Sequence, residues 1–450
     1  MARVDTDVFL VESEERLAVF APLRGVIAEV PSGLMSNGRG GGGTPPAASP
    51  SLAAFLKHLG LIVDDHQTTP RPVGTPSAAF APTGVVFMVT AACNLRCEYC
   101  YADAGDHVVE HFDHEMAVNA AHLVVDNAAD QATGEAYLNF HGGGEPTLDF
   151  DFIRDVVTRA REYAAARAGR PVKVLASMVT NGVMPRHRLE WIAANIDSIQ
   201  VSYDGPDDIH DRQRPTLHGG PSARLVRESI LYLQGRVPDL LIKSTISAAS
   251  VDRMPEIAEH LCSTFEIPRF HFGPVLGAGR GRFPQFGEPD PQQFIDGYVK
   301  ARAVAERHGR TIVVSAVERT FPRIRRTFCG ITDPNFALTP QGEISACYEV
   351  MYEADPRSGD YFFGHYDKES HRFVVDADRV AEIRRHDVND IPQCQRCFAK
   401  WQCAGDCQIR FRDSVSGEQL TGLDARCVIN RELVRMSVYK ELDRVHTGGA

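Results

Sequence analysis

The chain has 450 residues, of which 43% are hydrophobic and 24% charged, and its formal net charge is -11. This size and composition are typical of globular protein with about three domains, and the acidic balance argues against a general nucleic-acid binder. No apolar run reaches the ~18 residues that a membrane-spanning helix needs, and the acidic N-terminus lacks a signal-peptide core. We therefore expect a cytoplasmic protein that binds neither nucleic acid nor membrane.

The first 65 residues predict a small α+β module. Residues 51–63 combine a short amphipathic helix with an apolar strand. Further strands are predicted at residues 8–10, 17–20 and 26–28. The stretch 31–50 is rich in Gly, Pro and Ser, which is typical of a loop, and a Pro-rich linker covers residues 66–82.

Predicted strands and helices alternate from residue 83 to residue 318. The strands are expected at residues 85–90, 136–141, 172–179, 198–203, 241–247 and 269–275. The helices are expected at residues 113–129, 151–168, 186–194, 222–235, 251–265 and 292–309. Repeated units of this kind indicate a parallel sheet. Six of them predict an α/β fold, a partial (β/α)6 barrel of TIM type, with its chemistry at the C-terminal strand ends.

The pattern changes after residue 318. Cysteines, turns and irregular stretches dominate to residue 430, and a helix at residues 431–445 closes the chain. A cysteine-dense segment with little apolar periodicity depends on bound metal for its stability. We predict a separate cysteine-rich domain over residues 319–450.

Three cysteines, Cys93, Cys97 and Cys100, follow the first barrel strand at the spacing Cys-x3-Cys-x2-Cys. Three thiolates at this spacing can hold a [4Fe–4S] cluster and leave one iron open. An open position is what a catalytic metal site needs. A zinc site is the alternative, but zinc takes four ligands in structural sites, and no fourth Cys or His stands nearby in the sequence.

This loop, with an aromatic residue before its last cysteine, resembles the cluster loop of the radical S-adenosylmethionine (SAM) enzymes. The resemblance implies that SAM chelates the open iron and is cleaved reductively to a 5′-deoxyadenosyl radical. It also implies that Glu145 binds the SAM ammonium, that Arg214 pairs with the SAM carboxylate, and that Ser202 is a polar contact. The SAM-binding residues implied by the matching segments are Tyr99, Gly143, Gly144, Glu145, Pro146, Ser177, Asn181, Ser202 and Arg214.

Seven late cysteines resemble the SPASM extension of radical SAM enzymes that modify peptides and proteins. The resemblance implies two auxiliary [4Fe–4S] clusters, and so three clusters in all. The implied ligands are Cys329, Cys347 and Cys407 for the first auxiliary cluster, and Cys394, Cys397, Cys403 and Cys427 for the second. A zinc ribbon of the four central cysteines is the alternative, but it leaves Cys329, Cys347 and Cys427 without a role.

The number of ligands leaves one auxiliary iron without a motif cysteine. Of the eleven cysteines, ten belong to the two patterns, and the remaining one, Cys262, falls in a predicted barrel helix. A small buried hydrophobic residue is the simpler role for such a cysteine. We therefore predict that the first auxiliary cluster has an open iron or one bound by a group other than cysteine.

The resemblance favours a maturase that modifies a ribosomally made precursor peptide by oxidative crosslinking, through a carbon–carbon or thioether bond. Ferredoxin or flavodoxin would exchange electrons with it. In size and position the N-terminal module resembles peptide-recognition elements of such maturases, and a structural cap on the barrel is the alternative.

Other functions remain open: formylglycine formation on a sulfatase, oxidation of a small molecule, or a zinc-binding structural protein. In sulfatase-maturating relatives an Asp follows the cysteine that matches Cys347. Here Tyr348 and Glu349 follow it, as candidate proton acceptors or as ordinary loop residues.

Overall fold

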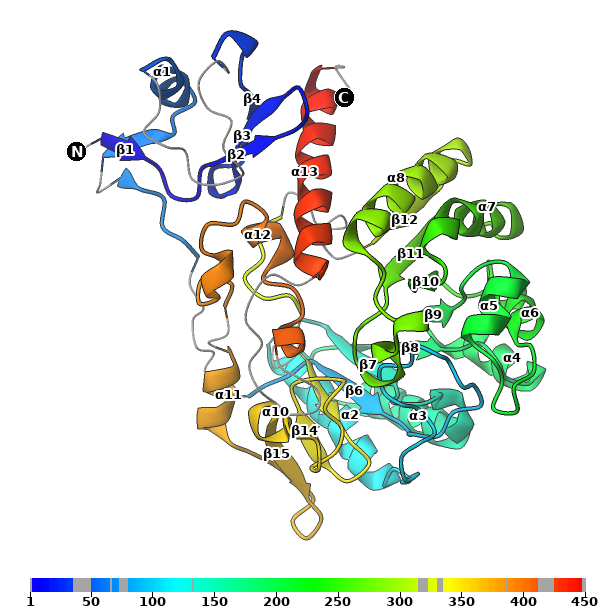
Figure 1. Ribbon diagram of the computed structural model, residues 1–450. Helices are drawn as coiled ribbons and strands as arrows, with labels where there is room; N and C mark the ends of the chain where they lie inside the picture. The colour runs from blue at the N-terminus through cyan, green and yellow to red at the C-terminus, as the bar shows by residue number, and fades with distance from the viewer. Residues whose placement is uncertain are drawn as a thin grey trace.

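The computed structural model describes residues 2–34, 50–64, 67–72, 80–131, 133–314, 323–329, 335–384, 387–411 and 425–446. Figure 1 shows three parts: an N-terminal module, a barrel covered by helices, and a C-terminal extension that runs along one edge of the barrel.

The N-terminal module contains two small antiparallel sheets and one helix. Its three-stranded sheet joins β2 (Phe9–Glu12), β3 (Leu17–Ala21) and β4 (Val26–Glu29). Its two-stranded sheet joins β1 (Ala2–Val4) and β5 (Ile62–Asp64), and the helix is α1 (Pro50–His58). Short 3-10 turns are η1 (Pro22–Arg24) and η2 (Ser32–Leu34). Part of the module has an apolar cluster of its own around Val19 and Leu56, whereas Phe9, Val11, Ala18 and Phe20 of β2 and β3 join the main apolar cluster that also contains the barrel and α13.

The barrel strands run parallel in chain order, as the sequence predicts. They are β6 (Gly84–Met88), β7 (Glu135–His141), β8 (Lys173–Thr180), β9 (Ser198–Ser202), β10 (Asp239–Ile246) and β11 (Arg269–Pro274). The short strand β12 (Thr311–Val313) extends the far edge in the same direction. The prediction of a partial α/β barrel is confirmed.

The barrel helices cover the outer face of this sheet. The main ones are α2 (His114–Asp130), α3 (Phe150–Ala166), α4 (Arg186–Asn195), α6 (Ala223–Leu233), α7 (Met254–Thr264) and α8 (Pro291–Arg307). Shorter elements are α5 (Asp207–Gln213), η4 (Pro146–Asp149), η5 (Val251–Arg253), η6 (Gly279–Arg282) and η7 (Pro284–Phe286). Local sequence fixes several helix starts: Asp113 accepts hydrogen bonds from the N–H groups of Glu115 and Met116 and so caps α2.

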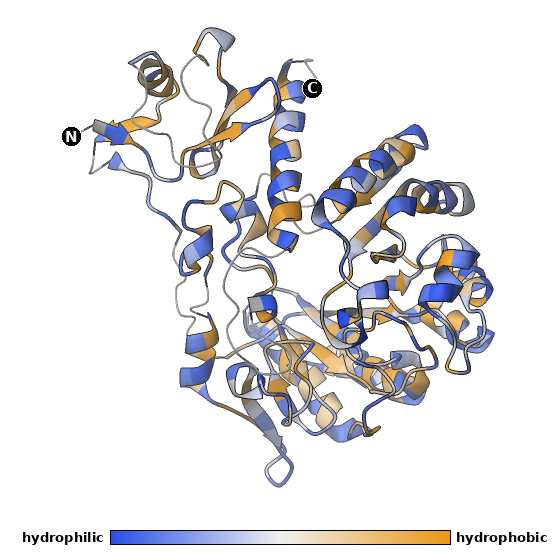
Figure 2. Cartoon of the chain, in the orientation of Figure 1, coloured by the Kyte–Doolittle hydropathy of each residue, from blue (hydrophilic) through white to orange (hydrophobic). Residues whose placement is uncertain are grey.

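Strand alternation divides the barrel into an apolar outside and a polar inside. In β10, Ile242, Ser244 and Ile246 are buried beneath the helices, whereas Lys243 and Thr245 face the interior of the barrel. Polar side chains also face inward from β7 (Asn139, His141) and β8 (Ser177). On β6, by contrast, Val86 and Met88 are buried and pack with Ala337 and Met351. Figure 2 shows hydrophobic strands beneath helices whose outer faces are hydrophilic. The interior therefore combines a polar region with an apolar cluster beside β6.

The C-terminal extension contains more regular structure than the sequence indicates. Strand β13 (Asn335–Leu338) pairs in parallel with β6, and β14 (Glu343–Ser345), β15 (Phe362–Asp367) and β16 (Arg372–Val375) follow as antiparallel strands, which gives one eleven-stranded sheet. The expectation of mainly irregular chain is wrong here, because strands of three to six residues are too short to show a period.

The helices of the extension are α10 (Ser358–Tyr361), α11 (Ala377–Arg384), α12 (Lys400–Cys403) and α13 (Ala425–His446), with the 3-10 turns η8 (Pro392–Cys394) and η9 (Gln408–Phe411). Helix α13 lies between the N-terminal module and α8 (Figure 1). Its Tyr439 hydroxyl donates to the carbonyls of Val11 and Arg16 at 2.8 and 2.9 Å. Across the described ranges, every helix is too short or too polar to span a membrane.

Candidate functional site

The early cysteine loop lies at the C-terminal end of β6. Its backbone is fastened to the segment after α5, because the N–H groups of Arg96 and Glu98 donate to the carbonyls of Pro215 and Gln213 at 2.8 and 2.9 Å. This contact brings together two sequence motifs that are more than a hundred residues apart.

Each of the three sulfurs in this loop accepts a hydrogen bond from nitrogen. The donors are the backbone of Leu95 for Cys93 at 3.5 Å, the backbone of Ala104 for Cys100 at 3.4 Å, and the guanidinium of Arg214 for Cys97 at 3.9 Å. N–H donors of this kind stabilise negative charge on sulfur. Burial raises the pKa of the Cys97 thiol to about 12, so a cluster would have to displace its proton on binding. The donor set fits a cluster held by three thiolates.

No three Cys, His, Asp or Glu side chains within the described ranges converge as ligands of a single metal ion. In a [4Fe–4S] cluster each thiolate holds a different iron, so the ligands surround the cluster rather than one ion. The early cysteines are nevertheless close enough to interact electrostatically, since Cys93 and Cys100 both act on Cys97.

The glycine turn after β7 packs directly on the cysteine loop. The N–H groups of Gly144 and Glu145 donate to the carbonyls of Thr90 and Ala92, each at 2.8 Å. A Cβ atom on Gly144 would lie 1.9 Å from the Ala92 carbonyl oxygen, and one on Gly143 would lie 2.8 Å from the sulfur of Met351. Only glycine permits this approach.

The turn holds the carboxylate of Glu145 in a buried position beside the cysteine loop. Its Oε1 atom accepts from Thr147 N, Thr147 Oγ1 and Thr180 Oγ1 at 3.1, 2.7 and 2.7 Å. Its Oε2 atom accepts from the N–H of Asn181 at 2.7 Å. Burial raises the pKa of this carboxyl. The single donor on Oε2 leaves room for a second one, such as an ammonium group.

Asp204, two residues after β9, is a candidate functional residue that the sequence analysis left without a role. Its carboxylate is fully buried and accepts from Tyr99 Oη at 2.5 Å, Gln213 Nε2 at 2.9 Å and Arg214 Nε at 2.9 Å. Its position, directly before Gly205 and at a strand end, was the available signal. Arg214, predicted to pair with the SAM carboxylate, thus has a partner inside the protein and also contacts Cys97.

The other predicted SAM contacts lie at different depths. Asn181 bonds to Asn94 at 2.7 Å beside the cysteine loop, and Pro146 opens η4 directly after Glu145. Ser202 ends β9 on the inner face. Ser177 lies deeper in the barrel, where its hydroxyl accepts from Asn139 at 3.0 Å. The roles of these residues toward SAM remain predictions.

The late cysteines form two groups in space. Electrostatic interactions link Cys347 with Cys329 and Cys407 in one group. They link Cys403 with Cys394, Cys397 and Cys427 in the other. These are the two sets that the SPASM resemblance implies, and their role as iron ligands remains a prediction. Cys262 is buried in the barrel core on α7, away from both groups.

A strained turn connects the two late groups. Ala404, Gly405 and Asp406, between Cys403 and Cys407, have φ values of 55°, 79° and 60°. Non-glycine residues in this region cost about 1–3 kcal/mol each. The turn is stabilised by the buried carboxylate of Asp406, which pairs with Arg426 at 2.6 Å and accepts from Asn430 at 3.0 Å.

The two candidate proton acceptors lie in different surroundings. Tyr348 stacks on His141 of β7, with ring centroids 5.4 Å apart, and so lies at the interior of the barrel. Burial raises the pKa of Tyr348 above its usual range, which makes it a donor rather than a base at neutral pH. Glu349 lies 3.5 Å from Arg357, outside that stack, and burial raises its pKa.

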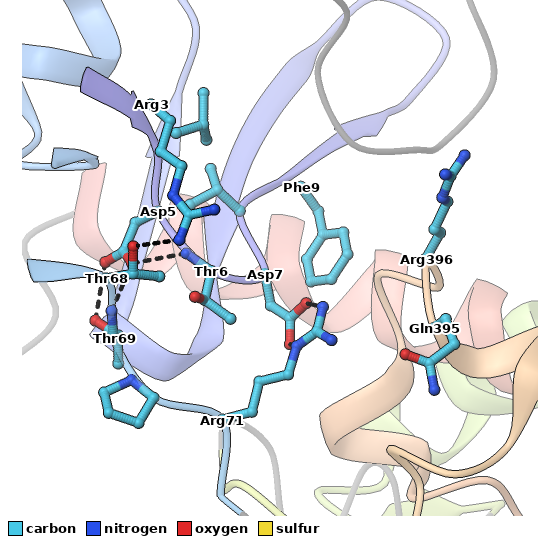
Figure 3. Close-up of a pocket in the computed structure, with 13 residues that line it drawn as sticks. Arg3, Asp5, Thr6, Asp7, Phe9, Thr68, Thr69, Arg71, Gln395 and Arg396 are labelled. Atoms are coloured by element: carbon cyan, nitrogen blue, oxygen red, sulfur yellow. Dashed lines mark hydrogen bonds and ion pairs between the residues drawn. The ribbon is translucent and has the colours of Figure 1, made fainter. Parts of the chain in front are cut away.

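A cavity of about 820 Å³ lies between the N-terminal module and the segment that holds Cys394 and Cys397. Figure 3 shows Arg3 and Thr68 on one side of it and Gln395 and Arg396 on the other. Its lining residues are Arg3–Phe9, Thr68–Arg71, Gln395 and Arg396. Because Gln395 and Arg396 lie between Cys394 and Cys397, this cavity borders the second late group.

The family model of the radical SAM superfamily matches residues 87–248, the segment that holds the cysteine loop, Glu145, Asp204 and Arg214. The barrel belongs to the radical SAM superfamily of enzymes. This superfamily uses SAM and a [4Fe–4S] cluster. This match confirms the predicted family for the barrel.

Curated relatives match parts of the radical SAM chain. The sporulation killing factor maturation protein SkfB of Bacillus subtilis is 24% identical over 210 residues, which is 45% of each chain. The cysteine-type anaerobic sulfatase-maturating enzyme of Clostridium novyi is 31% identical over 126 residues, or 27% of this chain and 32% of the relative. The chain thus matches less than half the length of either relative.

Solved structures match the radical SAM chain over a larger share. The anSMEcpe structure with bound AdoMet has a TM-score of 0.62 at 16% identity and covers 80% of this chain and 98% of its own. Streptococcus suis SuiB, solved with the precursor peptide SuiA, has a TM-score of 0.52 at 13% identity and covers 94% of this chain and 99% of its own. At these identities the likeness establishes the fold.

Proposed function

We propose that this radical SAM chain is a maturase with two auxiliary clusters that crosslinks side chains of a ribosomally made precursor peptide. The observation that carries the proposal is the position of Tyr348. Tyr348 follows Cys347, one of the late cysteines, and stacks on His141. His141 directly precedes the glycine turn that leads to Glu145. A substrate in the polar interior would therefore lie between the early and the late cysteines.

The chemistry of crosslinking fits two metal regions on opposite sides of a substrate. When bound, the SAM-ligated cluster supplies a 5′-deoxyadenosyl radical that takes one hydrogen atom, and the late clusters supply an acceptor for a second electron. Joining two side chains removes two hydrogens, the second as a proton and an electron. Ferredoxin or flavodoxin would deliver the electron for SAM cleavage and receive the electron released by the substrate.

The protein residues bind and orient the reactants. Glu145 offers its Oε2 atom to the SAM ammonium, and Asp204 fixes Arg214 beside Cys97 so that the guanidinium balances the charge of the early thiolates. The neutral phenol of Tyr348 closes the interior on the side of the late cysteines. Three thiolates on the first late cluster leave an iron open to substrate or to a ligand other than cysteine.

The N-terminal module is proposed to take the leader segment of the peptide. Its β1 strand pairs only with β5 among the described strands, so one edge is available for an added strand. Residues Arg3 and Val4 of that strand also line the cavity of Figure 3, together with Asp5, Asp7, Arg71 and Arg396. Because Arg71 pairs with Asp7, the cavity offers both charges and would suit a polar leader segment.

The test is anaerobic incubation of the reconstituted protein with SAM, dithionite and short peptides encoded beside its gene, followed by mass spectrometry. We expect a product two hydrogens lighter per crosslink, together with 5′-deoxyadenosine. A peptide from a sulfatase serves as the alternative substrate. Formylglycine on that peptide, without crosslinks in the peptides encoded beside the gene, would contradict the proposal. Mössbauer spectroscopy tests the open iron, because four thiolates on every auxiliary iron set would exclude it.

A further inference from the structure

Three paired residues on adjacent barrel strands place the ammonium group of Lys243 in the barrel interior. The parallel register pairs Lys243 of β10 with Ser202 of β9 and with His271 of β11. Paired residues of adjacent strands lie about 4.8 Å apart on the same face. The residues next to Lys243 in the chain, Ile242 and Ser244, are fully buried on the helix side. The Lys243 side chain therefore projects into the barrel.

Gly273, which has no side chain, lies beside Lys243 on the next strand. A Cβ atom on Gly273 of β11 would lie 3.5 Å from Cε of Lys243 and 3.6 Å from Cε1 of His271. The ammonium group has no hydrogen bond or ion pair to any residue in the described part of the chain. Lys243 is half-buried, and a cation that is withdrawn from bulk water without a partner is stabilised when a ligand supplies the opposite charge.

The charges around Lys243 do not neutralise it. Among the described residues, Arg214 and Arg426 repel it, and the carboxylate that attracts it, Asp204, already accepts hydrogen bonds from Arg214, Tyr99 and Gln213. His141 faces Lys243 from across the barrel, and burial together with Lys243 lowers the pKa of His141 to about 4, so it stays neutral. The described residues around Lys243 thus carry an excess of positive charge.

Lys243 also lies between the two groups of cysteines. Thr245, two residues along β10 on the same face, accepts from Arg214 at 3.4 Å, and Arg214 contacts Cys97. On the other side, Arg426 precedes Cys427. This is the place where the reactants would meet.

We propose that Lys243 binds a carboxylate inside the barrel. The carboxylate comes either from the methionyl part of SAM or from an acidic side chain of the peptide, and the second source rests on the function proposed above. In both cases Lys243 is a positioning residue that orients its ligand between the early and the late cysteines.

Binding measurements on the cluster-loaded protein test this proposal without turnover. Isothermal titration compares SAM with decarboxylated SAM, and N-acetyl-glutamate with N-acetyl-glutamine, in the native protein and in Lys243→Met. A lost charge-assisted hydrogen bond weakens binding about tenfold to a hundredfold. If SAM is the source, Lys243→Met abolishes the preference for SAM over its decarboxylated form. If the peptide is the source, the preference for N-acetyl-glutamate is abolished and SAM binding is unchanged.

The controls separate charge from packing. Lys243→Arg should keep most of the preference, and Lys300→Met, on the exposed face of α8, should keep all of it. Lys243→Gln serves if the Met variant does not fold. Unchanged preferences in the uncharged variants would overturn the proposal, and so would a Lys243→Arg variant no better than Lys243→Met. Since the probes are not peptides, these results hold whether or not a peptide is modified.

Discussion

The early cysteines stand within one eight-residue loop, whereas the late ones come from residues 329 to 427. The early loop forms at the end of one strand, β6, and is held by two backbone hydrogen bonds to Gln213 and Pro215 at the end of α5. The late groups need the added hairpin strands, the strained turn at Ala404–Asp406 and the start of α13. Conformational entropy explains the difference: sites built from distant segments must order more chain than local ones do.

The late groups also depend on the N-terminal module. Asp7 has a φ of 53° and a buried carboxylate. It accepts from Trp401 Nε1 at 2.9 Å, lies 3.4 Å from Lys400 Nζ, and pairs with Arg71 at 2.7 Å. Trp401 and Lys400 lie between Cys397 and Cys403. The module is therefore fastened to the second late group by a buried charge network.

The largest expected effect is the loss of the early cluster. Cys97→Ala should abolish 5′-deoxyadenosine formation, because two thiolates do not retain a cluster with one open iron. The measurement is chromatography of the nucleoside after reduction with dithionite. Cys262→Ala is the matched control, since that thiol lies in the core, and it should keep both the iron and the activity.

Loss of a late cysteine should stop peptide modification without stopping SAM cleavage. Cys394→Ala should keep SAM binding and 5′-deoxyadenosine formation but lose the peptide product, with iron falling from about twelve to about eight atoms per chain. Iron analysis and mass spectrometry check this. Loss of 5′-deoxyadenosine at full early-cluster occupancy would show that the regions are not independent.

Asp7→Ala tests the fastening of the late region. Removing one partner of a buried ion pair costs about 3–5 kcal/mol, so the unfolding midpoint in urea should fall and amide exchange around α12 should rise. Arg3→Gln, which loses an exposed hydrogen bond to Thr68, should stay within about 0.5 kcal/mol. Unchanged exchange around α12 in the Asp7 variant would refute the link.

Glu145→Gln tests the carboxylate of the early region. It should weaken SAM binding about tenfold to a hundredfold, because an amide no longer pairs with the ammonium. Equilibrium dialysis on cluster-loaded protein measures this. Glu190→Gln, on the exposed surface of α4, is the control and should bind SAM as the native protein does.

The smallest expected effect is a pH dependence of carboxylate binding by Lys243. Burial and the charges of Arg214 and Arg426, only partly offset by Asp204, lower the pKa of Lys243 to about 8. Below that pH the ammonium is charged, so carboxylate binding should be strong there and should weaken as pH rises through 8. Titration calorimetry from pH 6.5 to about 9 follows this. Lys243→Arg should remove the dependence, because its guanidinium stays charged.

The sequence predicted most of the barrel because its strands and helices are long enough to show their periods. It missed α5, because a helix of seven residues is too short to show its period. It also missed the strands β13–β16, which are too short to show an alternation. Candidate SAM residues could be predicted because glycines and strand-end polar residues are local signals, and their roles remain predictions.

The sequence alone determined the cysteine sets, the order of the barrel and the radical SAM family, because each depends on residues close together in the chain. Only the tertiary structure decided the pairing of Asp204 with Arg214, the stacking of Tyr348 on His141, the contact of Asp7 with Trp401 and the place of Lys243. These relations join residues that are distant in sequence and meet through strand register and packing. Neither spacing nor composition records such contacts, since any of these residues alone is an ordinary polar side chain.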